Sequence, residues 1–365
     1  MHMPPIPDHW RDAALTPPYA WGAPLAAGEL RSSPEDFVVD EILGFEAAGA
    51  GPHALLVVRK RGTNTEWVAR ELARAAGCKP FEVGFAGLKD RNAVTTQHFT
   101  VPCTAPGKRP RDAAEFIGVA GEGFEVLSAA AHQRKLPRGA LAGNRFDIVA
   151  RGVDCDPLTL TRRVAEIAAG GVPNYFGPQR FGRDAGNLSA VISAASVIAE
   201  GGRRERGRGR SDQGFMFSAA RSLIFNAILA ERVRAGTWNR LGAGDVANLD
   251  GRGSVFAVDA ADATIESRAA ALEIHPTAPL MGEATPMSSG EIAALEERAA
   301  GQFPEALAVI RAERMNAERR ALRIRVRELT HDYADGVLRV RFALDAGSFA
   351  TTVLREIIAV AKDEE

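Results

Sequence analysis

Two kinds of hydrophobic pattern divide the chain. Alternating apolar and polar residues, which are typical of half-buried strands, predict strands at 36–42, 54–59, 81–85, 98–101, 124–130, 145–150, 322–329 and 336–344. Apolar residues at helical spacing predict helices at 63–76, 157–169, 187–198, 215–234, 291–300, 304–320 and 349–360. Strand-rich ends around a helix-rich middle predict an α+β fold in which one domain is inserted into another.

Local signals define the ends of several predicted helices. Thr63 followed by Glu66 predicts a capping box, and Gly77 predicts the end of the same helix. Asp156 and Pro157 predict an N-cap and a first helical residue. Local sequence signals therefore predict both ends of the helix at 63–76 and the start of the helix at 157–169.

The composition permits two domains but does not identify a partner. The chain has 365 residues, a hydrophobic content of 46% and a formal net charge of -1. Because phosphate binding needs clustered Lys and Arg, any contact with nucleic acid must depend on basic stretches such as 203–210 and 319–327. Residues 1–28 are rich in proline and alanine, and we expect them to pack irregularly.

Several classes of protein are disfavoured by what the sequence lacks. Cys78, Cys103 and Cys155 lie far apart without a CxxC pair, so neither a zinc site nor a disulfide framework is predicted. The start has no apolar signal core and no apolar run reaches membrane-spanning length, so we expect a cytoplasmic protein without a membrane contact. The sequence has no Walker A, HExxH or GxSxG motif, and a GxGxxA match at 242–247 is weak because no apolar strand precedes it.

The most prominent polar cluster lies in the segment GFAGLKDRNAVTTQHFTV at 84–101. Its apolar alternation breaks at Gly87, and Lys89, Asp90 and Arg91 follow before the next predicted strand. An acid between two cations would thus be presented on a tight connection between strands, a place that often carries function. The alternative is a solvated turn whose Asp hydrogen-bonds its own backbone.

A second cluster is NYFGPQRFG at 174–182, where aromatic residues and glycines flank Gln179 and Arg180. Glycine lets a partner approach the backbone closely, and aromatic rings offer a stacking surface for bases. The alternative is a buried aromatic turn between helices.

Motifs spread along the chain resemble one known family. The segment AGLKDRNAVTTQ at 86–97 resembles the catalytic-aspartate motif AGxKDxxAxTxQ of the tRNA pseudouridine synthase D (TruD) family. The same family is matched by SPEDFVVDEILGFE, GALAGNRF, VPNYFGPQRFG, SAARSLIFNAILAERV, GRGSVF and AGSFATTVLREI. Several spaced motifs in the right order are far more specific than one, so the chain is identified as a member of this family.

The resemblance implies a fold and a reaction. The fold is a pseudouridine synthase catalytic domain, with a largely antiparallel mixed sheet flanked by helices, and an inserted, mostly helical TRUD domain. On this chain the catalytic domain would comprise 1–168 and 323–365, and the insertion 169–322. The reaction would convert uridine to pseudouridine in tRNA, at position 13 of the D-arm, without a metal or an organic cofactor. We also expect a monomer.

The resemblance also implies roles for single residues. Asp90 would be the catalytic acid, and its charge would be supported by a set of nearby residues: Arg31, Glu35 and Lys89. The flipped uridine would be bound by Phe37, Asn144, Phe146 and Phe349, with Asn144 also holding the Asp90 loop. Possible RNA contacts are Arg180, Arg203 and Arg204.

Two other functions stay open at this point. A protein that binds tRNA as a chaperone would use the same basic and aromatic residues but would not need Asp90. An RNA glycosidase would need the acid but would release free uracil.

Overall fold

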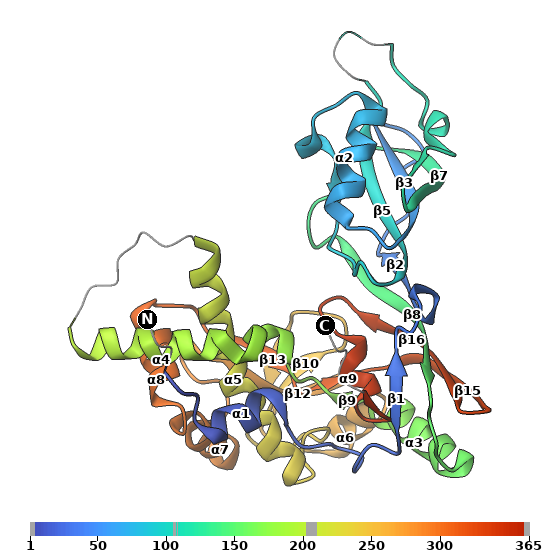
Figure 1. Ribbon diagram of the computed structural model, residues 1–365. Helices are drawn as coiled ribbons and strands as arrows, with labels where there is room; N and C mark the ends of the chain where they lie inside the picture. Colours follow the sequence, from blue (N-terminus) through green and yellow to red (C-terminus); the bar gives the residue numbers. More distant parts are fainter. Residues whose placement is uncertain (1–3, 105–106, 108, 202–209, 361–365) are drawn as a thin grey trace. The chain divides into compact units, whose positions relative to one another are not determined.

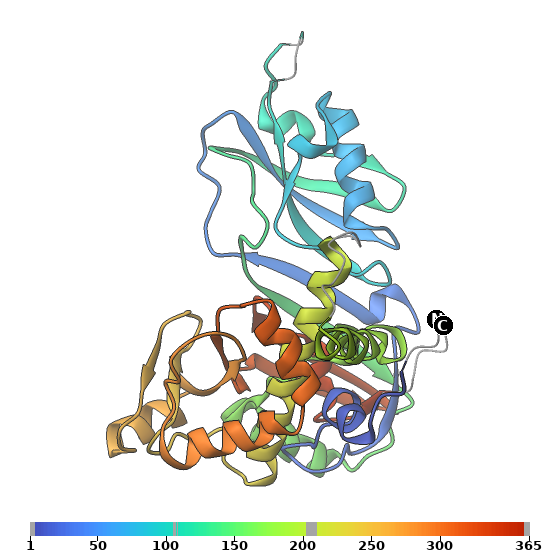
Figure 2. The same ribbon diagram turned by 90° about the vertical axis from the view of Figure 1, so that its left-hand side faces the viewer.

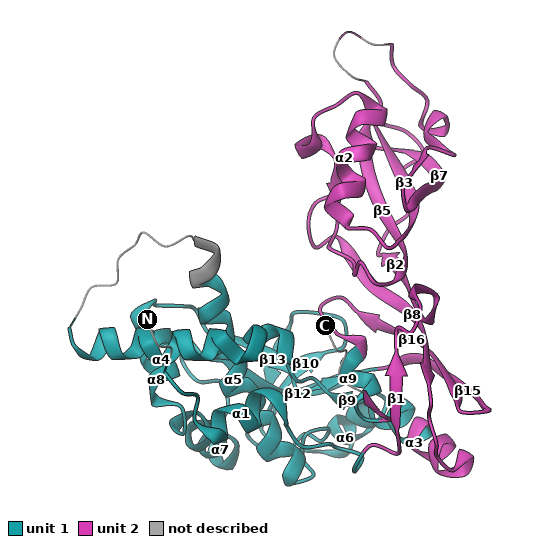
Figure 3. Cartoon of the chain, viewed as in Figure 1, with its two compact units in different colours: residues 1–23, 165–325, 351–356 teal, residues 24–164, 326–350, 357–365 magenta. Residues whose placement is uncertain are grey.

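The computed structural model describes residues 4–104, 107, 109–201 and 210–360. Contacts divide the chain into two compact units (Figure 3). Unit 1 comprises residues 1–23, 165–325 and 351–356, and unit 2 comprises residues 24–164, 326–350 and 357–365. The domain boundaries expected after residues 168 and 322 stay a prediction, because compactness alone does not establish independent folding.

Unit 2 is built on one mixed sheet of 11 strands (Figure 1). Its main path runs β15-β16-β8-β2-β5-β3-β7-β6, and β1, β4 and β17 pair beside it. Only the pairs β2–β5 and β1–β17 are parallel among those described. The strands are β1 (Ala27–Leu30), β2 (Phe37–Leu43), β3 (His53–Arg61), β4 (Gly84–Phe85), β5 (Val94–Pro102), β6 (Ala120–Gly121), β7 (Phe124–His132), β8 (Leu141–Arg151), β15 (Arg327–Ala334), β16 (Val337–Asp345) and β17 (Ala359–Val360).

Helix α2 (Thr65–Ala76) covers one face of this sheet at β3 and β5 (Figure 2). Its buried positions Val68 and Leu72 are four residues apart, so both face Leu56 and Phe99 on the strands. Gly77 ends the helix in the left-handed conformation at φ 73°, as its sequence predicts. This packing places the start of α2 beside the loop that precedes β5.

The other helical elements of unit 2 are short or reach its edge. They are η1 (Pro34–Asp36), η2 (Pro80–Glu82), η3 (Ala113–Phe116) and α3 (Pro157–Gly170), whose residues from 165 onward belong to unit 1. Asp156 accepts a hydrogen bond from the Thr159 N–H at 2.8 Å, which confirms the predicted cap of α3.

Unit 1 combines helices with a sheet of four strands in the order β11-β10-β12-β13. Its elements are α1 (Asp8–Leu15), β9 (Val172–Pro173), η4 (Pro178–Phe181), η5 (Arg183–Ala185), α4 (Gly186–Ala199), α5 (Arg210–Arg234), β10 (Val246–Leu249), β11 (Val255–Ala257), α6 (Ala263–Ala270), β12 (Ile274–Leu280), α7 (Gly290–Gly301), α8 (Pro304–Ala312), β13 (Glu318–Ala321), β14 (Arg323–Ile324) and α9 (Ala350–Leu354). The buried residues of α5 form the centre of its core, against α1, α4, α7 and α8.

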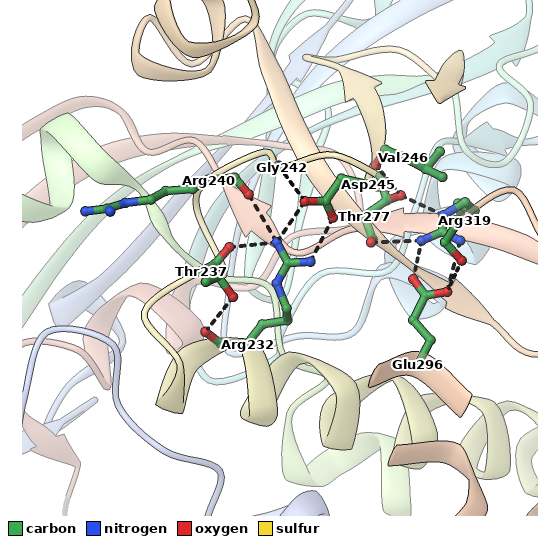
Figure 4. Close-up of polar contacts among 10 residues, drawn as sticks. Arg232, Thr237, Arg240, Gly242, Asp245, Val246, Thr277, Glu296 and Arg319 are labelled. Carbon is green, nitrogen blue, oxygen red and sulfur yellow. Dashed lines mark hydrogen bonds and ion pairs between the residues drawn. The ribbon is translucent and has the colours of Figure 1, made fainter. Parts of the chain in front are cut away.

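Two buried ion pairs of unit 1 are drawn in Figure 4. Arg232, on α5, lies 2.7 Å from the Asp245 carboxylate and donates to the carbonyl oxygens of Thr237 and Arg240. Arg319, on β13, pairs with Glu296 of α7. Removing one partner of such a pair would leave a buried charge, so these contacts fix how the helices meet the sheet.

Two helices predicted near the C-terminal end are present but shorter than predicted. The helix predicted at 304–320 ends at Ala312, and Glu318–Ala321 instead forms β13 on β12. The helix predicted at 349–360 spans only Ala350–Leu354, and residues 359–360 form β17 on β1. In both cases pairing with a distant strand outweighs the local helix preference, which is a weak determinant of structure.

Three local predictions in the first hundred residues are wrong. Residues 1–28 are not irregular throughout, since α1 and part of β1 lie there. The capping box is absent because α2 starts at Thr65, after Asn64. Phe81 does not begin a strand: it lies in η2 with 70% of its surface exposed, because Pro80 starts a 3₁₀ turn.

Candidate active site

The loop between β4 and β5 carries Asp90, and buried side chains hold its backbone. Gln97 of β5 donates its amide to the Gly87 carbonyl oxygen at 2.6 Å. Thr65 of α2 accepts a hydrogen bond from the Lys89 N–H at 3.0 Å and donates to Gln97 at 3.0 Å. Because Thr65 and Gln97 are buried, these hydrogen bonds are shielded from water and fix the loop on the sheet.

The Asp90 carboxylate is held by one charged donor and one backbone donor. Arg31 Nη2 lies 2.7 Å from Asp90 Oδ2, and the Asn92 N–H donates to Oδ1 at 3.0 Å. The side chain of Asp90 still exposes 39% of its surface. The carboxylate is thus oriented by a strong, charge-assisted hydrogen bond and can also be reached from solvent.

Arg31 links this carboxylate to the start of the sheet. It follows β1 in the left-handed conformation, with φ at 61°. Its Cζ lies 4.4 Å from the centroid of the Phe37 ring, a cation–π distance. The structure therefore brings together Arg31, Asp90 and Phe37, three of the residues that the family resemblance singled out.

Lys60 is a functional candidate that sequence reasoning missed. Its ammonium is buried at the end of β3 and donates to the carbonyl oxygens of Asp90 (2.6 Å), Thr63 (2.9 Å) and Lys89 (3.5 Å). Burial lowers the pKa of Lys60 to about 8, although the nearby charge of Asp90 opposes this shift. A signal existed, because Lys60 continues the inward-facing alternation of β3 by one position beyond the predicted strand.

The Lys89 side chain binds Glu41, a buried acid of β2, and not the Asp90 carboxylate. The Lys89 ammonium lies 2.8 Å from Glu41 Oε2, and the His98 N–H donates to Oε1 at 3.0 Å. Burial raises the pKa of Glu41, but the His98 hydrogen bonds and the Lys89 charge outweigh burial and leave the pKa below its ordinary value. Lys89 therefore supports Asp90 only indirectly, by fixing the backbone of the loop that carries both residues. Sequence reasoning also missed Glu41.

Two of the three candidate aromatic residues, Phe37 on β2 and Phe146 on β8, lie on neighbouring strands. The rings of Phe37 and Phe146 are 6.5 Å apart in an edge-to-face arrangement, and Phe146 lies 5.3 Å from Phe342. Phe37 and Phe146 are buried, at 5% and 6% exposure. Phe349 is half-buried directly before α9. Phe37 and Phe146 thus form part of a packed aromatic row, and a bound base would have to reach its edge.

Asn144 lies on β8 two residues before Phe146, on the same face of the sheet. Its register partners are Glu41 on β2 and Leu344 on β16. Its Oδ1 atom is buried without a hydrogen-bond partner in the described structure. A buried acceptor of this kind is costly unless a ligand supplies the donor.

The remaining candidates lie elsewhere. Glu35 accepts a hydrogen bond from Arg61 Nε at 2.5 Å, and this bond lowers the pKa of Glu35. Arg180, in unit 1, donates to Ser218 Oγ at 3.1 Å and lies 5.3 Å from the Phe176 ring centroid. Arg203 and Arg204 fall outside the described residues.

Metal-binding clusters and membrane-spanning helices do not occur in residues 4–104, 107, 109–201 and 210–360. No group of three His, Cys, Asp or Glu side chains there could hold a metal ion. No helix in those ranges is long and apolar enough to cross a bilayer.

The fold matches a solved structure over nearly its whole length. A crystal structure from Methanosarcina mazei, described as a putative tRNA pseudouridine synthase D, aligns with a TM-score of 0.71 and covers 97% of this chain and 98% of that one. The two sequences are 23% identical, so this likeness concerns the fold alone. It defines an α+β fold shared with that crystal structure.

Sequence comparisons identify the family. The family model described as tRNA pseudouridine synthase D (TruD) matches residues 16–194 and 213–357. A protein named tRNA pseudouridine synthase D from Methylococcus capsulatus (strain Bath) is 45% identical over 344 residues, 93% of this chain and 94% of the relative. One of the same name from Xanthomonas campestris pv. campestris (strain 8004) is 41% identical over 352 residues, again 93% and 94%. The chain belongs to the TruD family, whose members are isomerases.

Proposed function

We propose that this protein isomerises uridine to pseudouridine in tRNA, at position 13 of the D-arm. The observation that carries the proposal is the Asp90 carboxylate, held 2.7 Å from Arg31 and open to solvent on a rigid loop. The relatives from Methylococcus and Xanthomonas support the substrate class by their names. We further propose that residues 169–322 act as an inserted RNA-binding domain and that the protein works as a cytoplasmic monomer.

The reaction rearranges bonds without a change in oxidation state. The bond between ribose C1′ and uracil N1 breaks, the uracil rotates, and C1′ bonds to C5. The C5 hydrogen leaves as a proton and N1 takes up a proton from solvent, so the product is an isomer of the substrate. Asp90 serves as the nucleophile, on ribose or on the uracil ring, or as the base that removes a ribose proton. Each route uses the carboxylate oxygens of Asp90, which the Arg31 guanidinium orients at 2.7 Å.

The uridine must leave the RNA stack before Asp90 can reach it. Unstacking costs roughly a few kcal/mol, and stacking on an aromatic ring returns about 1–3 kcal/mol per base. Phe37, Phe146 and Phe349 would supply apolar contacts to the base. Asn144 Oδ1, buried and without a donor, would accept a hydrogen bond from the uracil N3–H. Glu35 and Lys89 would support the acid through neighbouring residues.

Phosphate contacts would come from basic residues distant in sequence from Asp90. We propose Arg180, Arg203 and Arg204 for this role, because phosphate binding depends on positive charge and not on the catalytic acid. Binding should therefore persist without Asp90 and weaken steeply with salt.

Tritium release from tRNA labelled at uridine C5 tests the function. Wild type in a chelating buffer is compared with Asp90→Asn and with Glu122→Gln, which changes an exposed acid of the same unit. We expect release by wild type and Glu122→Gln, and at least about a 100-fold slower rate for Asp90→Asn, since an acid–base group contributes about 100- to 10,000-fold.

Other outcomes would contradict the role of Asp90 or favour one of the two alternative functions. Wild-type activity in Asp90→Asn would contradict the role of the acid. Tight tRNA binding without release by wild type would favour the chaperone, and free uracil in the supernatant would favour the glycosidase.

A further inference from the structure

A hollow lined by aromatic and basic side chains lies beside the catalytic loop in unit 2. We call it the Phe81 site; its volume is about 270 Å³, and its wall includes Phe81, Phe85, Lys135 and Arg138. Phe81 exposes 70% of its surface from η2. Single exposed apolar residues are common, but Phe81 lines a hollow together with basic side chains, which makes its ring a candidate contact for a ligand.

The cations of the site lie on or near the two rings. The Arg138 Cζ lies 3.6 Å from the centroid of the Phe85 ring, and the Lys79 Nζ lies 5.8 Å from that of Phe81. Lys135 donates to the Phe81 carbonyl oxygen, which leaves two ammonium hydrogens for another acceptor. In the described part of the chain, none of these three cations has a carboxylate within ion-pair distance.

The backbone ties this site to the loop that carries Asp90. The Gly139 N–H donates to the Ala86 carbonyl oxygen at 2.7 Å, where that loop begins. The Leu136 N–H, in the same segment as Gly139, donates to Thr100 Oγ1 at 2.8 Å on β5. The wall formed by residues 135–138 is therefore fixed to the start of the Asp90 loop and to β5, the strand that follows it.

We propose that the Phe81 site binds a second, unpaired nucleotide of the substrate RNA. Its base stacks on the exposed Phe81 ring, and its phosphate is bound by Lys135 and Arg138. Stacking rings beside a basic groove are how proteins bind single-stranded nucleic acid. A volume of about 270 Å³ suits one base, since sites for drug-sized ligands are typically about 300–1,000 Å³.

The charge of the site favours RNA over a protein partner. Lysine is depleted in the cores of protein interfaces, whereas Lys79 lies near the Phe81 ring and Lys135 binds the Phe81 carbonyl oxygen. No acidic residue lines the hollow within the described part of unit 2. The inference rests on the proposed function, because it takes the substrate to be RNA.

Kinetics of the full chain on purified tRNA test the subsite. We expect Phe81→Ala to raise KM about ten-fold with kcat nearly unchanged, because the base no longer has a ring to stack on. Phe81→Trp should restore KM, since it keeps a stacking ring.

The double variant Lys135→Gln/Arg138→Gln tests the phosphate contact and should also raise KM. In binding measurements it should reduce the slope of log Kd against log salt concentration by about 0.7 for each phosphate that is no longer neutralised. Ile117→Ala, another exposed apolar residue of unit 2, is the matched control.

A binding measurement separates this inference from the proposed function. In a Phe81→Trp/Asp90→Asn protein, tRNA should quench the fluorescence of the new tryptophan, relative to the Asp90→Asn background. Wild-type release with an unchanged KM in Phe81→Ala would overturn the subsite, and would point to a protein partner at this ring, while leaving the function intact. Absence of release by wild type would overturn the function itself.

Discussion

Arg31 combines a strained backbone with two interactions of its side chain. Its left-handed φ of 61° costs of order 1–2 kcal/mol in a residue with a Cβ atom. This conformation is accompanied by two contacts of the guanidinium, which lies 2.7 Å from the Asp90 carboxylate and over the Phe37 ring. Strain of this kind persists only where surrounding contacts determine the conformation, and it is concentrated at functional sites. We therefore interpret Arg31 as selected for its position beside the acid.

Lys60 contacts the backbone of the same loop. Three backbone carbonyl oxygens share its ammonium, and two of them belong to Lys89 and Asp90. A buried ammonium needs acceptors, and the loop carbonyls need donors. Lys60 is thus a positioning residue for Asp90, because it binds the backbone and not the carboxylate.

Replacing Lys60 with methionine should slow catalysis more than it weakens binding. Met keeps most of the volume but donates no hydrogen bond, so the loop carrying Asp90 loses its anchor. A shift of about 1 Å in a reacting group can cost about 100-fold, and we expect kcat to fall about ten- to 100-fold with KM changed little. Steady-state tritium release on purified tRNA measures both constants. A rise in KM at constant kcat would contradict the positioning role.

The same residue predicts opposite pH trends for activity and stability. Burial, opposed by the charge of Asp90, sets the folded pKa of Lys60 at about 8, below its ordinary value of 10.5. The unfolded chain binds more protons between these two values, so the free energy of unfolding contributed by Lys60 rises from about pH 8 to 10.5. Activity should fall over that range as the charged anchor is lost. The Lys60→Met protein, measured in parallel by urea unfolding and by kcat, should show neither trend.

At the scale of elements, the catalytic loop is held by three parts of the sheet and one helix. Gln97 comes from β5, Lys60 from β3, Glu41 from β2, and Thr65 from α2. Strand β4, which leads into the loop, also packs closely against the backbone of Leu136. A Cβ atom added at Gly84 would lie 2.6 Å from the Leu136 carbonyl oxygen and 2.4 Å from Thr100 Oγ1. Only glycine therefore fits at the start of β4, the strand that leads into the loop.

Gly84→Ala should destabilise unit 2 and displace the loop. Overpacking typically costs about 1–3 kcal/mol, and here the neighbour is backbone that cannot rotate away. Gly44→Ala is the control, because its Cβ atom would meet Ala142 at an ordinary 3.5 Å. Urea unfolding followed by circular dichroism measures the difference, and we expect kcat to fall in Gly84→Ala alone. Equal stability of the two variants would contradict the close approach of β4 to Leu136.

The sequence was informative where local pattern and tertiary packing agree. Alternation at 145–150 predicted β8, and the inward positions Phe146 and Ile148 are buried. The polar break after Phe85 predicted that Asp90 lies on a connection between strands, and the structure has it there. Each of these signals is confined to a few consecutive residues, which is why it could be recognised.

Long-range contacts were not predictable in the same way. Lys60 meets the Asp90 backbone from 30 positions away, and Glu41 meets His98 from 57 positions away. The sequence of one strand does not show which distant residue its buried charged side chain will contact. The helix predicted at 304–320 was too long for the same reason, because Arg319 lies on β13, which pairs with β12, and its side chain pairs with buried Glu296.

At the scale of the whole molecule, both units are assembled from separated segments. Unit 1 takes its first segment from residues 1–23, although the family match begins at residue 16. Helix α1, which lies before that match, packs against α5. Trp10 on α1 is 1% exposed and meets the Phe303 ring at 5.7 Å in an edge-to-face contact. The N-terminal segment is thus a structural part of unit 1.

Trp10→Ala should therefore destabilise unit 1 more than its place outside the family match suggests. Truncating a buried tryptophan typically costs about 3–5 kcal/mol, through lost burial and the cavity that remains. Arg11→Ala, an exposed neighbour on the same helix, is the control. Hydrogen exchange measured by mass spectrometry should show protection lost in α5 and α8 and kept in β3 and β5. Unchanged protection in α5 would mean that α1 contributes little to the core, and equal loss in both units would mean that they unfold together.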